Sequence, residues 1–173
     1  MEIYEPKEDS YFFADFLKDY FLKSKKDISY LDMGTGSGIL SEVALKFLEE
    51  GNVLASDINE EAVDFVKSKG IPAIHSDLFS KIKDKFDLIT FNVPYLPLDK
   101  REPKNSRLAT TGGNRGDEIS VKFLKEAMKH LKLNGKILLL VSSLTPMERI
   151  KKFGGRVVAK KKLFMEELFI LEF

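Results

Sequence analysis

The sequence of 173 residues contains no cysteine and no tryptophan, and it has only two histidines. Without cysteine there is no disulfide framework, and two isolated histidines leave no plausible structural zinc site. The longest purely apolar run, Ile137 to Val141, is far shorter than the roughly 20 residues that cross a bilayer. These absences exclude disulfide-stapled, zinc-ribbon and membrane-spanning classes.

The charges nearly balance, with 28 basic and 27 acidic residues and a net charge of +1. Such a chain has no strong overall field to draw it toward nucleic acid or an anionic membrane. Residues 1–6 have no basic stretch followed by an apolar one, so we expect no signal peptide. A cytoplasmic enzyme is the expected class.

The periodicity of apolar residues alternates between strand and helix along the chain. Helices are expected over residues 11–21 (after a start signal at 8–10), 39–50, 59–69, 117–131 and 147–153. Strands are expected over residues 28–33, 53–56, 71–75, 86–91, 137–141, 157–161 and 168–173. Asn134 and Gly135 are expected to close the fourth of these helices.

This alternation predicts one α/β domain over residues 1–173, with a mostly parallel sheet covered by helices on both faces. The sheet should have seven strands, and the last two should form a hairpin that adds one antiparallel strand. The link between residues 75 and 86 is too short for a helical crossover, so an irregular segment is expected there.

A glycine-rich loop, Asp32–Gly38, follows the first expected strand and opens a helix. In that context glycines let the backbone approach an anionic or nucleotide-like ligand. The glycines stand at Gly34, Gly36 and Gly38, whereas Ile39 occupies the place of the third glycine of the dinucleotide fingerprint. The loop therefore indicates a nucleotide-like ligand other than NAD, although such turns also simply begin helices.

Carboxylates end the next two strands. Asp57, followed by Ile58, lies about 20 residues after the loop, where a carboxylate can accept both hydroxyls of a ribose. It could instead cap the next helix, but Asn59 can take that part. Asp77 could accept from an adenine amine while Leu78 offers its backbone N–H, although aspartate is also common in loops.

The fourth expected strand ends in Asn92-Val93-Pro94-Tyr95. The Asn92 side-chain oxygen and the Val93 carbonyl can each accept one N–H of a planar –NH₂ group, which orients its nitrogen for reaction. Pro94 restricts the turn, and Tyr95 can pack on the flat group. The competing interpretation is an ordinary turn, because asparagine and proline are turn residues.

Residues 96–116 have no clear period and carry several basic residues: Lys100, Arg101, Lys104, Arg107 and Arg115. Loops of this length inside a compact domain are usually functional or disordered. We favour a loop that faces the substrate over plain disorder.

Five blocks together resemble the HemK-like protein-glutamine methyltransferases, and within them the short archaeal and eukaryotic branch. These blocks are Tyr4–Ser10, the glycine loop, Ser56–Asn59, Phe91–Tyr95 and Gly112–Gly116. The resemblance extends over essentially the whole chain, and it implies the Rossmann-like fold of class I methyltransferases. It also implies that residues 1–25 form a helical segment over the cofactor site.

The resemblance further implies S-adenosylmethionine as the cofactor and assigns its contacts. Ser10, Asp32 and Gly34 would contact the methionine part, Asp57 the ribose, Asp77 and Leu78 the adenine, and Asn92 both cofactor and substrate. The substrate would be the glutamine of the Gly-Gly-Gln motif in a class I translation release factor.

In this branch a small zinc-binding activator subunit pairs along an edge strand, which here would be Ile71–Ile74. Val93 departs from the usual proline of the signature, but only its backbone carbonyl is needed. The N-terminal helical domain of the bacterial enzymes has no counterpart, so release-factor recognition would fall to the 96–116 loop and the activator.

Two alternatives stay open. The Asn92–Tyr95 site would hold adenine N6 or guanine N2 equally well, so a nucleic-acid amine methyltransferase is the first; it would need an extruded or single-stranded base and a broad basic surface. The second is a non-catalytic scaffold that binds the cofactor. Asn92, Pro94 and Tyr95 argue against it, because a scaffold has no need of them.

Overall fold

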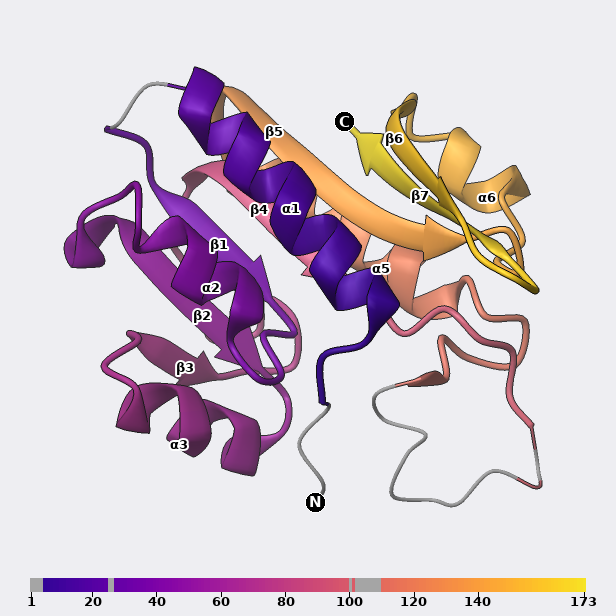
Figure 1. Ribbon diagram of the computed structural model, residues 1–173, viewed down its shortest axis with the longest axis horizontal. Coiled ribbons are helices and arrows are strands. Elements are labelled where there is room, and N and C mark those ends of the chain that lie inside the picture. The colour runs from indigo at the N-terminus through magenta and orange to yellow at the C-terminus, as the bar shows by residue number, and fades with distance from the viewer. Residues whose placement is uncertain (1–4, 25–26, 100, 102–109) are drawn as a thin grey trace.

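A seven-stranded sheet in the order β3-β2-β1-β4-β5-β7-β6 runs through the computed structural model, which describes residues 5–24, 27–99, 101 and 110–173 (Figure 1). The helices are α1 (Glu8–Lys23), α2 (Ile39–Ala44), α3 (Glu60–Ser68), α5 (Glu118–Ala127) and α6 (Glu148–Lys151), with 3-10 turns at Glu50–Asn52 and Met128–His130. The strands are β1 (Tyr30–Met33), β2 (Val53–Asp57), β3 (Ala73–His75), β4 (Phe86–Asn92), β5 (Leu131–Ser142), β6 (Arg156–Lys162) and β7 (Glu167–Glu172).

The predicted fold is confirmed in its strand directions. β1 to β5 run parallel to one another, β7 runs antiparallel to both β5 and β6, and β6 is therefore parallel to β5. The link from β3 to β4 consists of bends and turns without a helix, as its length required.

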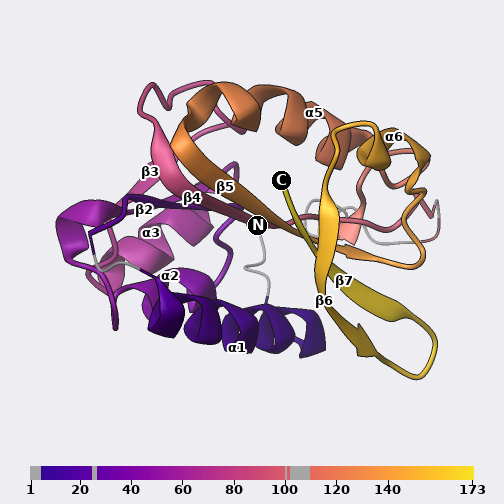
Figure 2. The same ribbon diagram turned by 90° about the horizontal axis from the view of Figure 1, so that it is seen from above.

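Helices cover both faces of the sheet, with α1, α2 and α3 on one side and α5 and α6 on the other (Figure 2). The apolar run in β5 is divided between these faces. Leu138 and Leu140 pack in the cluster of α1, whereas Ile137, Leu139 and Val141 pack in the cluster of α5. A strand buried on both faces reads as a continuous apolar run, and all five side chains are fully buried.

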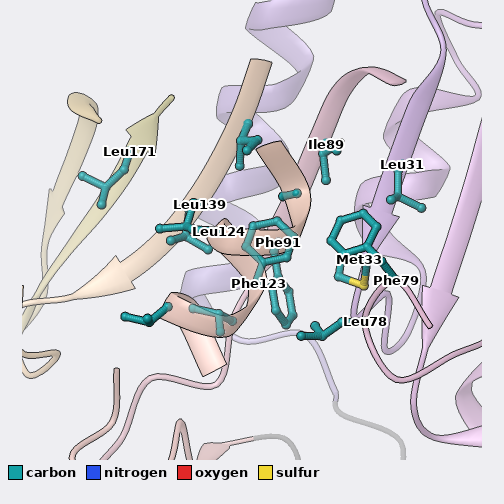
Figure 3. Packing of buried hydrophobic residues seen from close by; sticks show 14 of the residues in the cluster. Leu31, Met33, Leu78, Phe79, Ile89, Phe91, Phe123, Leu124, Leu139 and Leu171 are labelled. Atoms are coloured by element: carbon teal, nitrogen blue, oxygen red, sulfur yellow. The ribbon is translucent and has the colours of Figure 1, made fainter. Parts of the chain in front are cut away.

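The cluster under α5 holds the end of β4 in place (Figure 3). Phe91, the penultimate residue of β4, meets Phe123 of α5 edge to face, with ring centroids 4.9 Å apart. Phe123 in turn stacks on Phe79 at 5.9 Å. Such aromatic pairs add about 0.5–1.5 kcal/mol beyond simple burial, so the residue after Phe91 projects from a rigid base.

The helix expected over residues 39–50 is shorter than predicted, because α2 ends at Ala44. Beyond it the backbone tightens into i→i−3 bonds, from Lys46 N to Val43 O and from Phe47 N to Ala44 O. The tighter turn directs Phe47 against Phe21 of α1, with stacked rings at 5.8 Å. Tertiary packing overrides helical periodicity here.

The expectation that Asn134 and Gly135 close a helix was wrong. The helix gives way to β5 at Leu131, and both residues lie in a bulge of that strand. Asn134 has a φ of 64°, and the bulge lets the register move from Phe86↔Leu131 to Leu88↔Lys136. The pair is a turn signal, but sequence alone did not distinguish a strand bulge from a helix end.

Two strands are shorter at their start than predicted: β1 begins at Tyr30 and β3 at Ala73. Pro72 cannot donate to a neighbouring strand, although its carbonyl accepts from Ala55 N at 2.8 Å. Within the described residues, no helix is both long and apolar enough to cross a membrane.

Candidate functional site

A cavity of about 230 Å³ opens where β1, β2 and β4 end side by side. Its wall contains every residue that the sequence predicted for the site except Gly38: Ser10, Asp32, Gly34, Gly36, Asp57, Ile58, Asp77, Leu78, Asn92, Val93, Pro94 and Tyr95. In open α/β sheets the ligand lies outside the carboxyl ends of the strands. Parallel strand order is what gathers residues from four separate motifs.

The glycine loop turns sharply at Gly34, Gly36 and Gly38, whose φ angles are 61°, 53° and 85°. A Cβ at Gly34 would lie 2.5 Å from Cε2 of Phe91, so the strand end beneath leaves no room for a side chain. Gly38 faces away from the cavity wall, and its Cβ would lie 2.8 Å from Val66. Gly38 therefore serves the packing of α2 against α3.

Asp32 ties the glycine loop to the start of α2. Its Oδ2 accepts from Thr35 Oγ1 at 2.7 Å, from Ser41 Oγ at 2.7 Å and from Ser41 N at 3.2 Å. Burial raises the pKa of this carboxyl to about 6, partly offset by those hydrogen bonds, and the Asp57 charge adds to the rise. Asp32 lines the cavity, but one of its oxygens is used to hold the loop.

Asp57 joins the end of β2 to the same loop. Its Oδ2 accepts from Gly36 N at 2.9 Å and its Oδ1 from Asn59 N at 2.8 Å. Asn59 caps α3 by accepting from Glu61 N at 3.2 Å, as predicted. Burial raises the pKa of Asp57, while backbone N–H donors lower it. Asp57 is thus not needed as the cap.

Leu78 has a φ of 45°, a left-handed conformation that costs energy for any residue with a Cβ. Its carbonyl accepts from Ser76 Oγ at 2.7 Å, and its side chain is buried. The neighbouring Asp77 is about half exposed, and both of its oxygens accept from Lys122 Nζ at 3.1 Å. The carboxylate expected to meet an adenine amine therefore has a cationic partner from α5.

Asn92 ends β4 with an amide whose two ends have different surroundings. Its Nδ2 donates to Asp9 Oδ2 at 3.2 Å and to Ser10 Oγ at 3.4 Å. A carboxylate can only accept, so the amine end must face Asp9 and the oxygen end is fixed on the other side. Oδ1 is buried and has no hydrogen-bond partner in the described part of the chain. Asn92 lines the cavity, so its amide is held in one orientation at the cavity wall.

The turn after Asn92 combines a buried and a half-buried side chain. Val93 is 1% exposed and packs in the α5 cluster, so its side chain anchors the turn from below. Tyr95 contacts both clusters. Burial raises the pKa of the Tyr95 hydroxyl, and the carboxylates of Asp9 and Glu166 raise it further. Tyr95 accordingly stays neutral at physiological pH.

The 96–116 loop is anchored at both ends. Leu96 pairs with Thr111 in a parallel bridge, and Gly112 N donates to Leu96 O at 2.9 Å. Of the five basic residues, Arg101 pairs with Asp99 and Arg115 lies 3.9 Å from Asp117. Lys100, Lys104 and Arg107 fall outside the described residues. Leu96 and Thr110 line the cavity, so the base of this loop belongs to the site.

Four residues of the site were missed by the sequence analysis. Thr35 and Ser41 bond to Asp32, Asp9 bonds to Asn92, and Lys122 bonds to Asp77. Thr35 stands inside the glycine loop, which was a usable signal. Asp9 was part of the expected helix start and of the Tyr4–Ser10 block but was given no role of its own, and Lys122 lies on a helix that carries no motif. Among the described residues no group of histidines and carboxylates is placed to hold a metal.

Comparison with known proteins gives consistent matches. The family model described as the methyltransferase small domain matches residues 14–165. A protein of Methanocaldococcus jannaschii, provisionally named a protein N5-glutamine methyltransferase, is 35% identical over 98% of this chain and 90% of its own. The release factor glutamine methyltransferase of Lactococcus lactis is 36% identical over 66% of this chain, which spans 47% of that protein.

Two solved structures illustrate the fold. The ribosomal protein L11 methylase of Lactobacillus delbrueckii has a TM-score of 0.69 at 19% identity, over 96% of this chain and 79% of its own. The N-methyltransferase NodS of Bradyrhizobium japonicum, solved with S-adenosyl-L-homocysteine, has a TM-score of 0.66 at 13% identity, over 98% and 88%. At these identities the likeness establishes the Rossmann-like methyltransferase fold alone.

Proposed function

The chain belongs to the methyltransferase small domain family, and we propose that it transfers the methyl group of S-adenosylmethionine to the side-chain amide of a glutamine in the Gly-Gly-Gln motif of a translation release factor. Two findings support this choice of acceptor. The relative that matches almost end to end is named for protein N5-glutamine methylation, and a second is named for release factors. Because the chain spans only about half of the second relative, the release factor is the finer part of the proposal.

The observation that carries the proposal is the unpaired Oδ1 of Asn92. A buried acceptor without a donor costs about 1–3 kcal/mol. A glutamine amide entering the cavity brings a planar –NH₂, and one of its N–H groups can donate to Oδ1. The Asp9 contact at 3.2 Å keeps the Asn92 amide from turning its own amine to that position. The site therefore offers a hydrogen-bond acceptor, which an incoming –NH₂ group requires.

The residues around the cavity fit the cofactor. Gly34 and Gly36 line the cavity without side chains, and the Asp57 carboxylate can accept from ribose hydroxyls while it keeps its bonds to Gly36 and Asn59. Asp77 and Leu78 would hold the adenine, and Ser10 and Asp32 the methionine part. When bound, the cofactor supplies an electrophilic methyl group on a sulfonium.

The residues of the chain orient the substrate amide and stabilise the charge that develops on its nitrogen. An amide nitrogen is a weak nucleophile because its lone pair is delocalised over the carbonyl. Asn92 Oδ1 and the Val93 carbonyl each accept one N–H, which holds the amide plane and favours the positive charge that develops on nitrogen. The ring of Tyr95 packs on the flat amide group, and because its hydroxyl is neutral it adds no charge to the site. The methylated nitrogen then releases one proton to solvent and remains a neutral secondary amide.

The nucleic-acid alternative gains no support from the described surface. It needs a broad basic face, whereas the described arginines of the 96–116 loop each lie beside an aspartate. A small zinc-binding activator subunit is proposed as the partner at β3, because this strand is one edge of the sheet and, in the described part of the chain, pairs with β2 alone. Co-expression that yields a stable heterodimer, lost on substituting Ile74 by proline, would support the partner.

The test uses the purified protein, labelled cofactor and a purified release factor. We expect label on the motif glutamine by mass spectrometry, and none when that glutamine is replaced by glutamate, which has the same shape but no –NH₂. Total RNA in a parallel reaction is the control for the alternative. Labelled RNA with an unlabelled release factor would overturn the proposal.

A further inference from the structure

The turn between β6 and β7 exposes apolar side chains that neither the core nor the cavity uses. Phe164 is 99% exposed and Met165 is 81% exposed, and Leu144 from the segment after β5 is 49% exposed. Lys161 and Lys162 precede them and take part in no ion pair found among the described residues. We call these five residues the hairpin-tip surface. The bonds between Ser143 and Glu167 bring the two segments side by side, and exposed apolar groups gathered on a folded domain commonly mark an interaction site.

This surface is held rigidly. Leu163 N donates to Glu166 O at 2.8 Å within the turn. Ser143 N donates to Glu167 O at 2.7 Å, Glu167 N donates to Ser143 Oγ at 3.0 Å, and Ser142 Oγ bonds to Glu166. These contacts fix the turn to the end of β5. A preformed surface loses little conformational entropy when a partner docks on it.

The turn between β6 and β7 lies at the end of the sheet that the carboxyl ends of β4 and β5 reach (Figure 1), and the cavity is lined by residues at that same end. β6 is parallel to β4, so the carboxyl ends of both strands lie at the same end of the sheet. Asn92 pairs with Leu140 of β5. Two residues further along β5, Ser142 bonds to Glu166 in the turn between β6 and β7. Three strand spacings separate β4 from β6, or roughly 15 Å at about 4.8 Å each. Glu166 of the turn also acts on Tyr95, since its charge helps to raise the pKa of that hydroxyl.

We propose that the hairpin-tip surface docks the acceptor protein beside the loop that enters the cavity, by meeting an apolar patch with an acidic border. This inference rests on the proposed function. Extended chain covers about 3.3 Å per residue, so the protein surface roughly five residues from the methylated glutamine would reach Phe164. Phe164 and Met165 supply adaptable apolar contact, and Lys161 and Lys162 supply complementary charge. β3 lies at the opposite edge, so a subunit pairing there leaves this surface open.

The experiment compares an intact release factor with a short peptide that contains Gly-Gly-Gln. The double substitution Phe164→Ser and Met165→Ser removes the apolar contact at two exposed positions. Leu133→Ser is the matched control, because Leu133 is 91% exposed at the far end of β5. Calorimetry measures binding of the release factor, and labelled cofactor measures kcat/KM for both substrates.

We expect the double variant to bind the release factor about tenfold more weakly and to lose kcat/KM on it through KM, with activity on the peptide and Tm unchanged. The double substitution Lys161→Glu and Lys162→Glu should weaken binding most at low salt. Unchanged affinity for the release factor in the variant with Phe164→Ser and Met165→Ser would overturn the docking proposal. Two other outcomes would also overturn it: the wild type forms a dimer that the Phe164→Ser and Met165→Ser variant does not form, or the wild type binds anionic vesicles and that variant does not. If the wild type methylates neither substrate, the proposed function falls and the docking role with it.

Discussion

The two halves of the cavity are built differently. In the half formed by the glycine loop and Asp57, each carboxylate already accepts several donors from the chain, chiefly Thr35, Ser41, Gly36 and Asn59. In the half formed by Asp9 and residues 92–95, the amine end of Asn92 is bonded and its oxygen end is not. We call these the cofactor half and the acceptor half.

This difference teaches how binding and reaction are divided. A half that satisfies its own polar groups keeps its shape with or without a ligand, which lowers the entropic cost of binding. A half that leaves an acceptor unpaired gains most when the right donor arrives. Substitutions in the cofactor half should therefore change affinity, and substitutions in the acceptor half should change turnover.

The largest effect is expected for Asn92→Ala in the acceptor half. Removing the oriented acceptor should lower kcat about 10²- to 10³-fold, as loss of one preorganised group at a developing charge does elsewhere. Cofactor affinity by calorimetry should change far less, and Tm should fall only slightly, because removal of the unpaired buried oxygen offsets the lost bonds from Nδ2 to Asp9 and Ser10. Undiminished turnover in this variant would contradict the mechanism.

The next effect is expected for Asp57→Ala in the cofactor half. The change removes a ribose acceptor and leaves Gly36 N and Asn59 N without their partner. Bonds to charged groups contribute about 1.5–3 kcal/mol each, so the Kd for cofactor should rise about 10- to 100-fold. At saturating cofactor, kcat should recover to near the wild-type value. Asp64→Ala on the exposed face of α3 is the control, and equal affinities for cofactor in both variants would remove Asp57 from the site.

The sequence predicted the local signals of both halves, for a physical reason. The glycine loop, Asp57 and Asn59 are local signals, because each follows a strand and acts within a few residues of its own turn. Parallel strand order then brings these turns together without further information. The same reasoning located Asn92 at the end of β4.

What it missed depends on distant pairs. Asp9 and Asn92 are 83 residues apart, and Asp77 and Lys122 are 45 apart. Neither pair has a spacing or motif that could reveal it, because the contact exists only once α1 and α5 are packed on the sheet. Asn134 was misread for a related reason: a positive φ suits a bulge and a helix end equally, and only the pairing of β4 with β5 decides.

A smaller effect on turnover is expected for Asp9→Ala, which tests whether Asp9 positions Asn92. Without the carboxylate the Asn92 amide can rotate and present its amine to the substrate. We expect kcat to fall about tenfold with cofactor Kd and KM for the acceptor nearly unchanged. Asp9→Glu should recover part of the loss. Asp15→Ala on the exposed face of α1 is the control, and a fall in Tm that accounts for all lost activity would reduce Asp9 to a structural residue.

The last effect concerns the pH dependence of stability, not turnover or affinity, and it acts through Asp32 in the cofactor half. Its folded pKa of about 6 lies above the ordinary value of 3.8, so the folded protein binds this proton more tightly than the unfolded chain does. The stabilisation is fully present below the unfolded pKa and is lost as pH rises through the folded pKa. Between pH 4 and 6 the wild type should therefore lose up to about 1.4 kcal/mol per pH unit relative to Asp32→Asn, which has no charge to bury. Denaturant unfolding of both proteins at pH 4, 5, 6 and 7 measures the difference. Parallel curves would mean that the hydrogen bonds from Thr35 and Ser41 fully offset the burial of the charge, and that the loop is held by an ionised Asp32 throughout.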